Sequence, residues 1–233
     1  MKAVILAGGI GSRLAPYTTV LPKPLMPLGD KPILEILIRG LKKHDVGEIT
    51  LSVGYLSSLI MAYLGKGEQL NIPIEYSHES EPLGTAGPLA LVEGLDSTFL
   101  AMNGDLLTDL DFRKIIEFHR SNKADVTVGI YGREVNIDFG VIKTDKDNRL
   151  TDYIEKPSIQ YQVSMGVYVL EPVVLEFIPR NKRFDFPDLI KALLRENKRV
   201  CAYVHSGYWL DIGRTEDYLR AQNELSQIKS YYE

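Results

Sequence analysis

The fold is decided by Leu6-Ala7-Gly8-Gly9-Ile10-Gly11-Ser12-Arg13-Leu14 and by Pro22-Lys23-Pro24-Leu25, which follows it. The apolar run Val4–Leu6 predicts a short strand that leads directly into three glycines. Glycines permit positive φ angles, and successive backbone N–H groups in such a turn form an anion-binding site. Arg13 and Lys23 add two cations to this loop. We therefore predict a strand-and-loop unit that binds a triphosphate.

Other interpretations of the loop are weaker. The spacing of a P-loop, in which a Lys and a Ser or Thr follow the second glycine, is absent. A dinucleotide fold needs Gly-x-Gly-x-x-Gly and an acidic residue about 20 residues on. Here Leu14 stands where the third glycine belongs, and the next strand-like run, Ile49 to Tyr55, ends without an acid. A tight turn without a ligand is the structural alternative, and three glycines with two cations disfavour it.

The composition limits the class of protein. The chain has 233 residues, 45% of them hydrophobic, and a net charge of −4 with a pI of ≈ 5.7. It can form one large α/β domain or two small ones, and nothing in its charge suggests a nucleic-acid partner. The single Cys201 is expected to be a buried, inert thiol in a reducing compartment. We find no signal-peptide pattern and no membrane-spanning apolar run, so we expect no membrane partner and a cytoplasmic location.

Strand-like and helix-like runs alternate over about the first 130 residues. Strands are expected at Met1–Leu6, Glu48–Tyr55, Ile72–His78, Thr98–Asn103 and Ala124–Tyr131. Helices are expected after Asp30, at Ser57–Leu64, at Pro88–Leu95 and at Phe112–Asn122, with Asp30 and Asp111 as N-caps. This β-α-β order predicts an α/β fold, a Rossmann-like, doubly wound mixed sheet that is mostly parallel and has helices on both faces.

The pattern changes after Gly132. Two strands, Asp138–Thr144 and Leu150–Glu155, flank a polar turn. The strands Gln162–Leu170 and Val200–His205 and the helices Pro187–Glu196 and Thr215–Ile228 complete the second half. We interpret residues 1–233 as one domain, with a nucleotide half at about 1–130 and a substrate half at about 131–233 that shares the same sheet.

Two later motifs lie where ligands bind in open α/β sheets. Glu81-Pro82-Leu83-Gly84-Thr85-Ala86-Gly87-Pro88 follows a strand and opens a helix, so its backbone N–H groups are expected to contact a ligand. Asn103-Gly104-Asp105 stands at the carboxyl end of a strand, where Asp105 offers a hard oxygen ligand suited to Mg²⁺. Asp109 and Asp111, close by, fit better as a turn residue and a helix cap. For Glu81, a solvated loop residue without a ligand is the weaker alternative.

Three motifs follow in the second half of the chain. Tyr208-Trp209-Leu210-Asp211-Ile212-Gly213 supplies another carboxylate, and we interpret Trp209 as a core residue. Tyr153-Ile154-Glu155-Lys156-Pro157 and Phe139-Gly140-Val141 belong to the predicted hairpin region. No histidine spacing suggests zinc, and no Ser/His/Asp arrangement suggests a protein nucleophile.

In this order, the motifs resemble the signature of sugar-1-phosphate nucleotidylyltransferases over nearly the whole chain. The motif sequences are most similar to those of the mannose-1-phosphate guanylyltransferases. Ser12 stands where the family usually has Thr and keeps the hydroxyl. Ser164-Met165-Gly166 replaces a segment in which many relatives have an Asn that contacts the sugar. Some longer relatives carry a β-helix extension of hexapeptide repeats. Because these repeats are absent, the chain resembles a short, single-domain form.

The resemblance implies roles for particular residues. Arg13, Lys23, Asp105 and Asp211 would be catalytic, and Asp105 and Asp211 would hold Mg²⁺. Glu81 and the backbone from Gly84 to Gly87 would contact the base. The residues implied to bind the nucleotide are Leu6, Ala7, Gly8, Gly9, Gly11, Ser12, Arg13, Lys23, Glu81, Pro82, Gly84, Thr85, Gly87, Asn103 and Asp105. Those implied to bind the sugar phosphate are Gly140, Glu155, Lys156 and Ser164.

The implied reaction converts a nucleoside triphosphate and a sugar 1-phosphate into a nucleotide sugar and pyrophosphate. A carboxylate accepts two N–H bonds from a guanine edge but only one from uracil or thymine, which favours GTP. The resemblance implies mannose 1-phosphate or a related manno-configured sugar as the second substrate. A UTP- or CTP-dependent enzyme for another sugar 1-phosphate stays open as an alternative. So does a non-catalytic, nucleotide-sugar-binding regulatory subunit. The expected partners are these small molecules, and the oligomeric state stays open.

Overall fold

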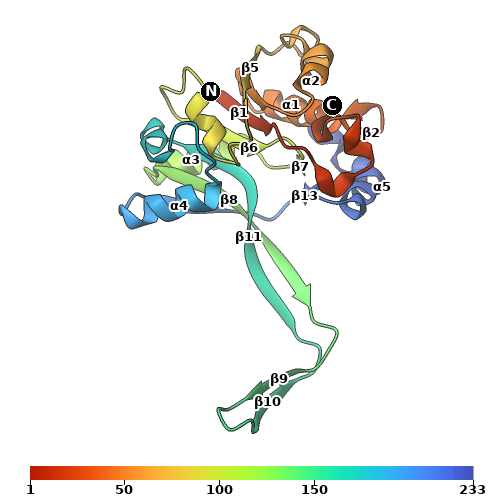
Figure 1. Cartoon of the computed structure of the whole chain (residues 1–233), viewed down its shortest axis with the longest axis vertical. Helices are drawn as coiled ribbons and strands as arrows, with labels where there is room; N and C mark the ends of the chain where they lie inside the picture. The colour runs from red at the N-terminus through yellow and green to blue at the C-terminus, as the bar shows by residue number, and fades with distance from the viewer. Residues whose placement is uncertain (233) are drawn as a thin grey trace.

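A seven-stranded sheet forms the centre of the molecule in the computed structural model, which describes residues 1–232 (Figure 1). The strands lie in the order β12-β8-β11-β6-β1-β4-β5. Their bounds are β1 Lys2–Ala7, β4 Glu48–Val53, β5 Ile74–His78, β6 Phe99–Asn103, β8 Val126–Asn136, β11 Ser158–Leu170 and β12 Val200–His205. Only β11 runs antiparallel to its neighbours. The predicted mixed, mostly parallel α/β sheet is confirmed.

Helices cover both faces of the sheet because successive strand residues point to opposite sides. On β1, Ala3 and Ile5 face a core cluster formed with α1 (Ile33–Lys43), α2 (Ser57–Leu64) and α3 (Phe112–Ser121). Val4 faces a second cluster with α4 (Phe186–Arg195) and the short 3₁₀ helices η5 (Gly87–Leu91) and η6 (Pro172–Phe177). A third cluster lies under α5 (Thr215–Tyr232).

Short elements connect the sheet to its surroundings. β7 (Leu106–Thr108) pairs antiparallel with β13 (Trp209–Asp211), and β2 (Pro27–Leu28) pairs with β3 (Lys31–Pro32). Three further 3₁₀ turns follow β1, namely η1 (Ser12–Leu14), η2 (Tyr17–Thr19) and η3 (Lys23–Leu25), and η4 (Glu68–Leu70) precedes β5. The loop after β1 is therefore a chain of tight turns.

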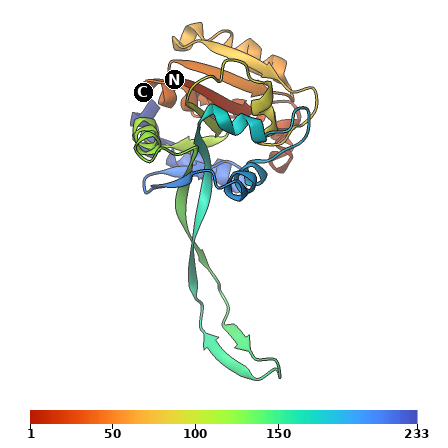
Figure 2. The same cartoon turned by 90° about the vertical axis from the view of Figure 1, so that its left-hand side faces the viewer.

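Residues 132–162 form a long β-hairpin that leaves the body, here called the arm (Figure 1). The outer parts of β8 and β11 form its stem, and β9 (Val141–Thr144) and β10 (Leu150–Ile154) pair at its end. The view turned by 90° shows the same projection, so the arm points away from the body in both directions of view (Figure 2).

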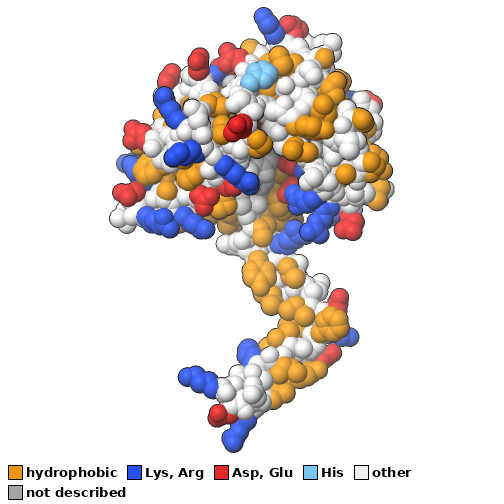
Figure 3. Space-filling model, in the orientation of Figure 1, with side chains coloured by type: hydrophobic (Ala, Val, Ile, Leu, Met, Phe, Trp, Pro, Cys, Tyr) orange, Lys and Arg blue, Asp and Glu red, His pale blue; other side chains and the backbone are white. Residues whose placement is uncertain are grey.

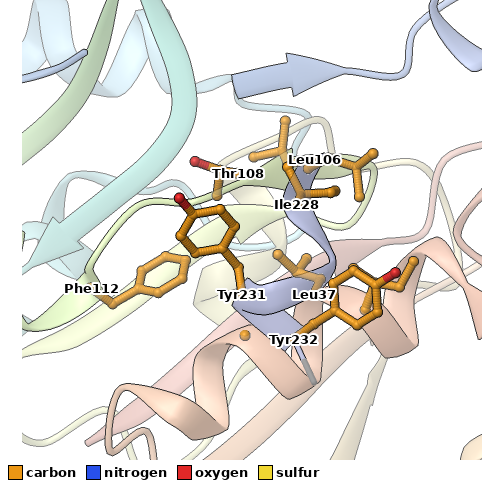
Figure 4. A pocket seen from close by; sticks show the side chains of 10 residues that line it. Leu37, Leu106, Thr108, Phe112, Ile228, Tyr231 and Tyr232 are labelled. Carbon is orange, nitrogen blue, oxygen red and sulfur yellow. The ribbon is translucent and has the colours of Figure 1, made fainter. Parts of the chain in front are cut away.

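The C-terminal helix α5 closes the side of the body next to α1. Tyr218 Oη donates a hydrogen bond to the Pro27 carbonyl at 2.6 Å, and Lys43 Nζ donates to the Ser230 carbonyl at 2.8 Å. Between α1, β7 and α5 lies a cavity of only ≈ 20 Å³, where Tyr231 and Tyr232 lie near Leu37 and Phe112 (Figure 4). A cavity of this size holds about one water molecule, so we interpret it as a packing gap.

Several sequence-based boundaries need correction. Asp30 does not cap α1, because the helix begins only at Ile33 and Asp30 binds Lys31 at 2.7 Å instead. The helix expected at Pro88–Leu95 is only the 3₁₀ turn η5, because Val92 leaves the helical region and Gly94 has a φ of 71°. Cys201 is half-buried rather than buried, since β12 is an edge strand. Within residues 1–232, no helix is both long and apolar enough to cross a membrane.

Asp111 and Asp30 offer a matched test of helix capping. The Asp111 carboxylate accepts a hydrogen bond from the Arg113 backbone N–H at 3.0 Å, whereas Asp30 caps no helix. We expect Asp111→Ala to lower the free energy of unfolding by about 0.5–2 kcal/mol. Asp30→Ala should change it by less than about 0.5 kcal/mol. Urea unfolding followed by circular dichroism measures both, and equal effects would contradict the assignment of Asp111 as the cap.

Candidate nucleotide site at the sheet switch point

A cleft of ≈ 580 Å³ opens at the carboxyl ends of β1 and β6. These two strands are neighbours, and the strand order reverses between them, because β4 and β5 extend the sheet to one side and β6 to the other. Ligands bind at such a switch point in open α/β sheets. The cleft is lined by Leu6, Ala7, Gly8, Gly9, Gly11, Ser12, Arg13, Lys23, Pro24, Glu79, Pro82, Gly84, Thr85, Asn103, Gly104, Asp105, Arg183, Asp185 and Asp211.

Two of the three glycines of the first loop are constrained by their neighbours, whereas a Cβ on Gly9 would meet nothing within 4 Å. A Cβ on Gly8 would lie only 2.4 Å from Glu79 Oε1, and Gly11 has a φ of 69° with a would-be Cβ 3.1 Å from Lys23 Cβ. Within the described chain, the N–H groups of Gly9, Ile10 and Gly11 donate no hydrogen bond. They are therefore available to a ligand, which fits the predicted anion-binding turn.

Lys23 and Asp105 join the two sides of the cleft. Lys23 is buried, with 8% of its surface exposed, and its Nζ donates to Asp105 Oδ2. The other carboxylate oxygen, Asp105 Oδ1, is buried and has no hydrogen-bond partner among the described residues. A buried oxygen without a partner is unfavourable unless a ligand or ion completes its coordination. The sequence predicted both residues but not their direct contact.

The pairing of β7 with β13 places Asp211 beside Asp105. Asp211 lies opposite Leu106 in this ladder, and the Ile212 N–H donates to the Asp105 carbonyl at 3.1 Å. The side chain is exposed to the cleft, but the concave wall desolvates it. This desolvation and, next, the Asp105 charge raise the pKa of Asp211, while Lys23 and Arg13 oppose the shift. Two residues 106 positions apart thus meet electrostatically, as the family resemblance implied.

Arg13 completes the charged end of the cleft. Its guanidinium lies against Gly213, where a Cβ would come within 3.6 Å of both terminal nitrogens. Its charge is one of those that lower the pKa of Asp211. Two carboxylates beside two cations suit a hard divalent ion that also binds phosphate oxygens and keeps several waters. Within residues 1–232, no group of three or more His, Cys, Asp or Glu side chains is arranged so that it could hold a metal ion.

The neighbouring polar residues keep their predicted structural roles. Asp109 accepts a hydrogen bond from the Tyr208 N–H at 2.7 Å and lies 2.8 Å from His205 Nε2. The Trp209 indole N–H donates to the Met165 carbonyl at 3.1 Å, and its ring packs against Tyr131 at 5.3 Å. Trp209 is therefore a packing residue, as expected.

The second loop differs from expectation at its acidic residue. Glu79, not Glu81, lies in the cleft wall. Its carboxylate accepts hydrogen bonds from Ser52 Oγ at 3.2 Å and from the Leu83 N–H at 3.0 Å. Glu81 is exposed and outside the cleft lining. Glu79 directly follows the last residue of β5. Ligands bind at the carboxyl ends of strands in open α/β sheets, so the argument that pointed to Asp105 could also have pointed to Glu79.

A segment that the sequence analysis missed holds this loop in place. The Asp185 carboxylate accepts a hydrogen bond from the Thr85 N–H at 2.9 Å, and the Phe184 carbonyl accepts from the N–H groups of Ala86 and Gly87 at 2.9 and 2.8 Å. These N–H groups are therefore occupied within the protein and not offered to a ligand, contrary to the prediction. Gly87 is buried behind the loop and does not line the cleft.

The residues implied to bind the sugar phosphate do not lie in this cleft. Gly140, Glu155 and Lys156 belong to the arm, and none of the three lines the cleft. Gly140 fits against the Tyr153 ring, and Glu155 accepts a hydrogen bond from Tyr153 Oη at 3.0 Å. Ser164 lies at the base of the arm, where its Oγ is 3.1 Å from Tyr168 Oη. The structure thus brings the predicted nucleotide residues together, with the exception of Glu81 and Gly87, but separates them from the sugar-phosphate set.

Comparison with known proteins identifies the family of this chain. Residues 2–228 match the family model described as Nucleotidyl transferase, and the chain belongs to this family. A curated relative, Mannose-1-phosphate guanyltransferase of Aspergillus fumigatus, is 35% identical over 94% of this chain and 62% of its own length. The chain therefore spans less than two thirds of that relative. The predicted resemblance to sugar-1-phosphate nucleotidylyltransferases is confirmed at the level of the family.

Solved structures show the same fold over full-length chains. HddC from Yersinia pseudotuberculosis is 31% identical with a TM-score of 0.73, and the match covers 96% of this chain and 99% of HddC. HddC has also been solved in complex with GMP-PN. A putative glucose-1-phosphate thymidylyltransferase from Bacillus anthracis is 26% identical with a TM-score of 0.77, over 96% of this chain and 94% of its own.

The electrostatics of the carboxylate pair can be measured directly. Asp105→Asn removes a negative charge that raises the pKa of Asp211, so we expect that pKa to fall toward its ordinary value. Lys23→Met removes an opposing cation and should raise it further. Carboxyl-carbon NMR titrations, assigned with Asp211→Asn, report these shifts. Asp217→Asn is the control, because Asp217 is the weakest of the named influences and should cause a smaller fall. If the pKa of Asp211 does not change in Asp105→Asn, the two carboxylates do not interact electrostatically and the assignment is wrong.

Proposed function

We propose that the protein transfers a nucleotidyl group from a nucleoside triphosphate to a sugar 1-phosphate and releases pyrophosphate. The observation that carries this proposal is the carboxylate oxygen Asp105 Oδ1, buried without a partner beside Lys23 and Asp211 at the end of a glycine loop. A site with unused N–H groups, two cations and two carboxylates is suited to phosphate groups together with a divalent cation. We further propose that residues 1–130 form the nucleotide half and residues 131–233 the sugar-phosphate half.

The chemistry requires positioning rather than a protein nucleophile. The phosphate oxygen of the sugar 1-phosphate attacks the α-phosphorus in line, a new P–O bond forms, and the bond to the leaving pyrophosphate breaks. Two anions must approach each other, and negative charge spreads over the transferred group. Arg13 and Lys23 stabilise this charge, and the loop N–H groups add fixed dipoles. The buried contact with Asp105 holds the Lys23 ammonium in place before the substrate arrives.

Asp105 and Asp211 are the residues that would hold Mg²⁺. Their fit is supported by the unpartnered Oδ1 atom and by their shared position at the cleft floor. When bound, the cation would neutralise triphosphate charge and act as a Lewis acid. Deprotonated carboxylates are needed for this role. Because its pKa is raised, Asp211 loses its proton at a higher pH than an ordinary aspartate does.

For the substrates we propose GTP and mannose 1-phosphate or a related manno-configured sugar. The named activity of the Aspergillus relative and the GMP-PN complex of HddC support guanine. UTP, CTP or dTTP with another sugar is the second candidate, supported by the name of the Bacillus anthracis structure. A non-catalytic binding subunit is disfavoured, because all four charged residues of the proposed chemistry are present and gather in one cleft. A panel of nucleoside triphosphates crossed with sugar 1-phosphates, scored by pyrophosphate release, tests the proposal.

The charged residues of the cleft are the first targets for substitution. We expect Arg13→Ala or Lys23→Ala to reduce turnover by roughly 10²–10³-fold, as for the loss of one preorganised charge-stabilising group. Asp105→Asn and Asp211→Asn should abolish Mg²⁺-dependent activity, and chelation should stop the native enzyme. Pyrophosphate release and circular dichroism are measured together, so that loss of folding is recognised. Near-native turnover of both Arg13→Ala and Lys23→Ala would overturn the proposal.

The base preference can be tested with two acidic residues of the same loop. Glu79 lies in the cleft wall and Glu81 outside it. We expect Glu79→Gln to reduce kcat/KM for GTP more than for UTP, since unpaired polar groups in a site discriminate strongly. Glu81→Gln is the matched control and should leave both values nearly unchanged. A selective effect of Glu81→Gln would restore the prediction made from the sequence, and a native preference for UTP or CTP would refute the guanine proposal.

A further inference from the structure

The arm separates two parts of one proposed site. Glu155 and Lys156 lie in the arm between β10 and β11, whereas the nucleotide cleft lies in the body (Figure 1). The two perpendicular views agree that the arm extends away from the body (Figures 1 and 2). No residue of the arm lines the cleft. Within one copy of the chain, the cleft therefore lacks the side chains that its second substrate is proposed to need.

The arm is too apolar for a hairpin surrounded by water. No residue between 132 and 162 is buried, and hydrophobic side chains follow its length (Figure 3). The arm contributes eight of the eighteen exposed large hydrophobic residues of the described chain, and Phe139 is 77% exposed. The eight are Val135, Phe139, Ile142, Leu150, Tyr153, Ile154, Ile159 and Tyr161. A contiguous exposed apolar surface of this kind marks an interaction site.

These side chains are ordered by the strand register. Val135 lies opposite Ile159 in the stem, and Ile142 lies opposite Tyr153 at the end. Paired residues point to the same face of a two-stranded ribbon, so each pair forms one apolar patch. An isolated two-stranded hairpin is marginally stable in water, and its faces need something to pack against.

The base of the arm is fixed to the body, which limits how far it can bend back. β8 and β11 continue from the central sheet into the stem without interruption of either strand. At the junction, Gly166 has a φ of 70°, and a Cβ there would lie 2.7 Å from Asn103 Nδ2. Tyr131 packs on Trp209 at the same place. The β8–β11 register shifts at this base, between Ser164 and Tyr168, and the resulting direction of the arm leaves Glu155 and Lys156 outside the cleft of their own chain.

The cleft mouth offers a surface that matches the arm. Ile10, Tyr17 and Val20 belong to the turns around the glycine loop, and all three are exposed, Val20 by 75%. They are large apolar side chains of the same segment that carries the cleft residues Gly11 and Lys23, and they do not line the cleft themselves. An apolar arm and an apolar rim that are both uncovered in one copy can cover each other between two copies, and reciprocal contacts of this kind close into a two-fold dimer.

We propose that the arm of one copy of this chain docks at the cleft mouth of a second copy and supplies Glu155 and Lys156 to its partner's sugar-phosphate site. The proposal rests on the proposed function, because it assigns these two side chains to the substrate of that reaction. The occupant is a second copy, since the sugar-phosphate motif on the arm completes the half-site that each cleft presents. Each dimer then contains two composite sites, and a single copy contains none.

Co-expression of two inactive variants tests whether the site is shared. One copy carries Asp105→Asn in the cleft, the other carries Lys156→Ala on the arm, and different affinity tags allow the mixed species to be purified. In a mixed dimer, the intact arm of the first copy meets the intact cleft of the second. We expect the purified mixed species to recover about half of native activity, because one of its two sites is intact. Each variant alone should remain inactive.

Light scattering tests the docking without any assay of activity. The native protein should be a dimer at micromolar concentration, and Phe139→Ser combined with Ile142→Ser should shift it to a monomer while its circular dichroism is retained. Leu194→Ser removes an exposed side chain of similar character from α4 and should leave the dimer unchanged. A monomeric native protein, or a dimer that the arm substitutions leave intact, would overturn the proposal.

The two failures are distinguishable. If the native protein is active and mixed species form but recover no activity, the arm works in its own chain and the shared site is refuted. If the native protein releases no pyrophosphate with any substrate pair, the proposed function fails. The light-scattering comparison then still decides whether the arm docks on a second copy.

Discussion

The contact between Lys23 and Asp105 is the interaction on which the rest of the site depends. It joins the loop that leaves β1 to the loop that leaves β6, the two strands between which the order of the sheet reverses. Taking one partner away from a buried pair leaves a charge without compensation, at a cost of about 3–5 kcal/mol. A buried pair is nevertheless weak evidence for stability, since apolar residues of the same size often serve the fold as well. Its position in the cleft lining fits the binding role that we propose for it.

The sequence predicted the central fold because its signals are local and strongly periodic. The apolar runs of β1, β4 and β6 indicate buried strands, and α2 and the Asp111 cap agree with the structure. Asp105 could be placed at a ligand-binding edge because it follows a strand, whereas Asp211 was assigned beside it from the family resemblance, since the β7–β13 pairing that joins them has no signal in the sequence. The errors lie where tertiary contacts outweigh local preference. The turn after Gly87 stops early, and Asp30 binds Lys31 instead of a helix end.

The details of the second loop could not be read from local sequence. Glu79 and Glu81 are two residues apart and chemically equal, and only the bonds of Glu79 with Ser52 and Leu83 place it in the wall. Asp185 and Phe184 support this loop from about 100 positions further along the chain. No periodicity connects such segments, although Asp185 immediately before a helix with Pro187 could have been recognised as a site of polar contacts.

The arm shows why a motif and its place in space are separate questions. The motif Tyr153-Ile154-Glu155-Lys156-Pro157 resembles a substrate-binding segment. In one copy, however, it lies on a two-stranded ribbon and none of its residues is buried. β8 and β11 continue beyond the body as paired strands, from Gly132 to Asn136 and from Ser158 to Gln162, so backbone hydrogen bonding fixes the ribbon, while side-chain burial does not. Hydrophobic burial is the dominant favourable term in folding, and a ribbon that forgoes it must gain it elsewhere. Docking of the arm on a partner surface therefore explains two observations together: the exposed apolar side chains of the arm, and the absence of the proposed sugar-phosphate residues from the cleft of their own chain.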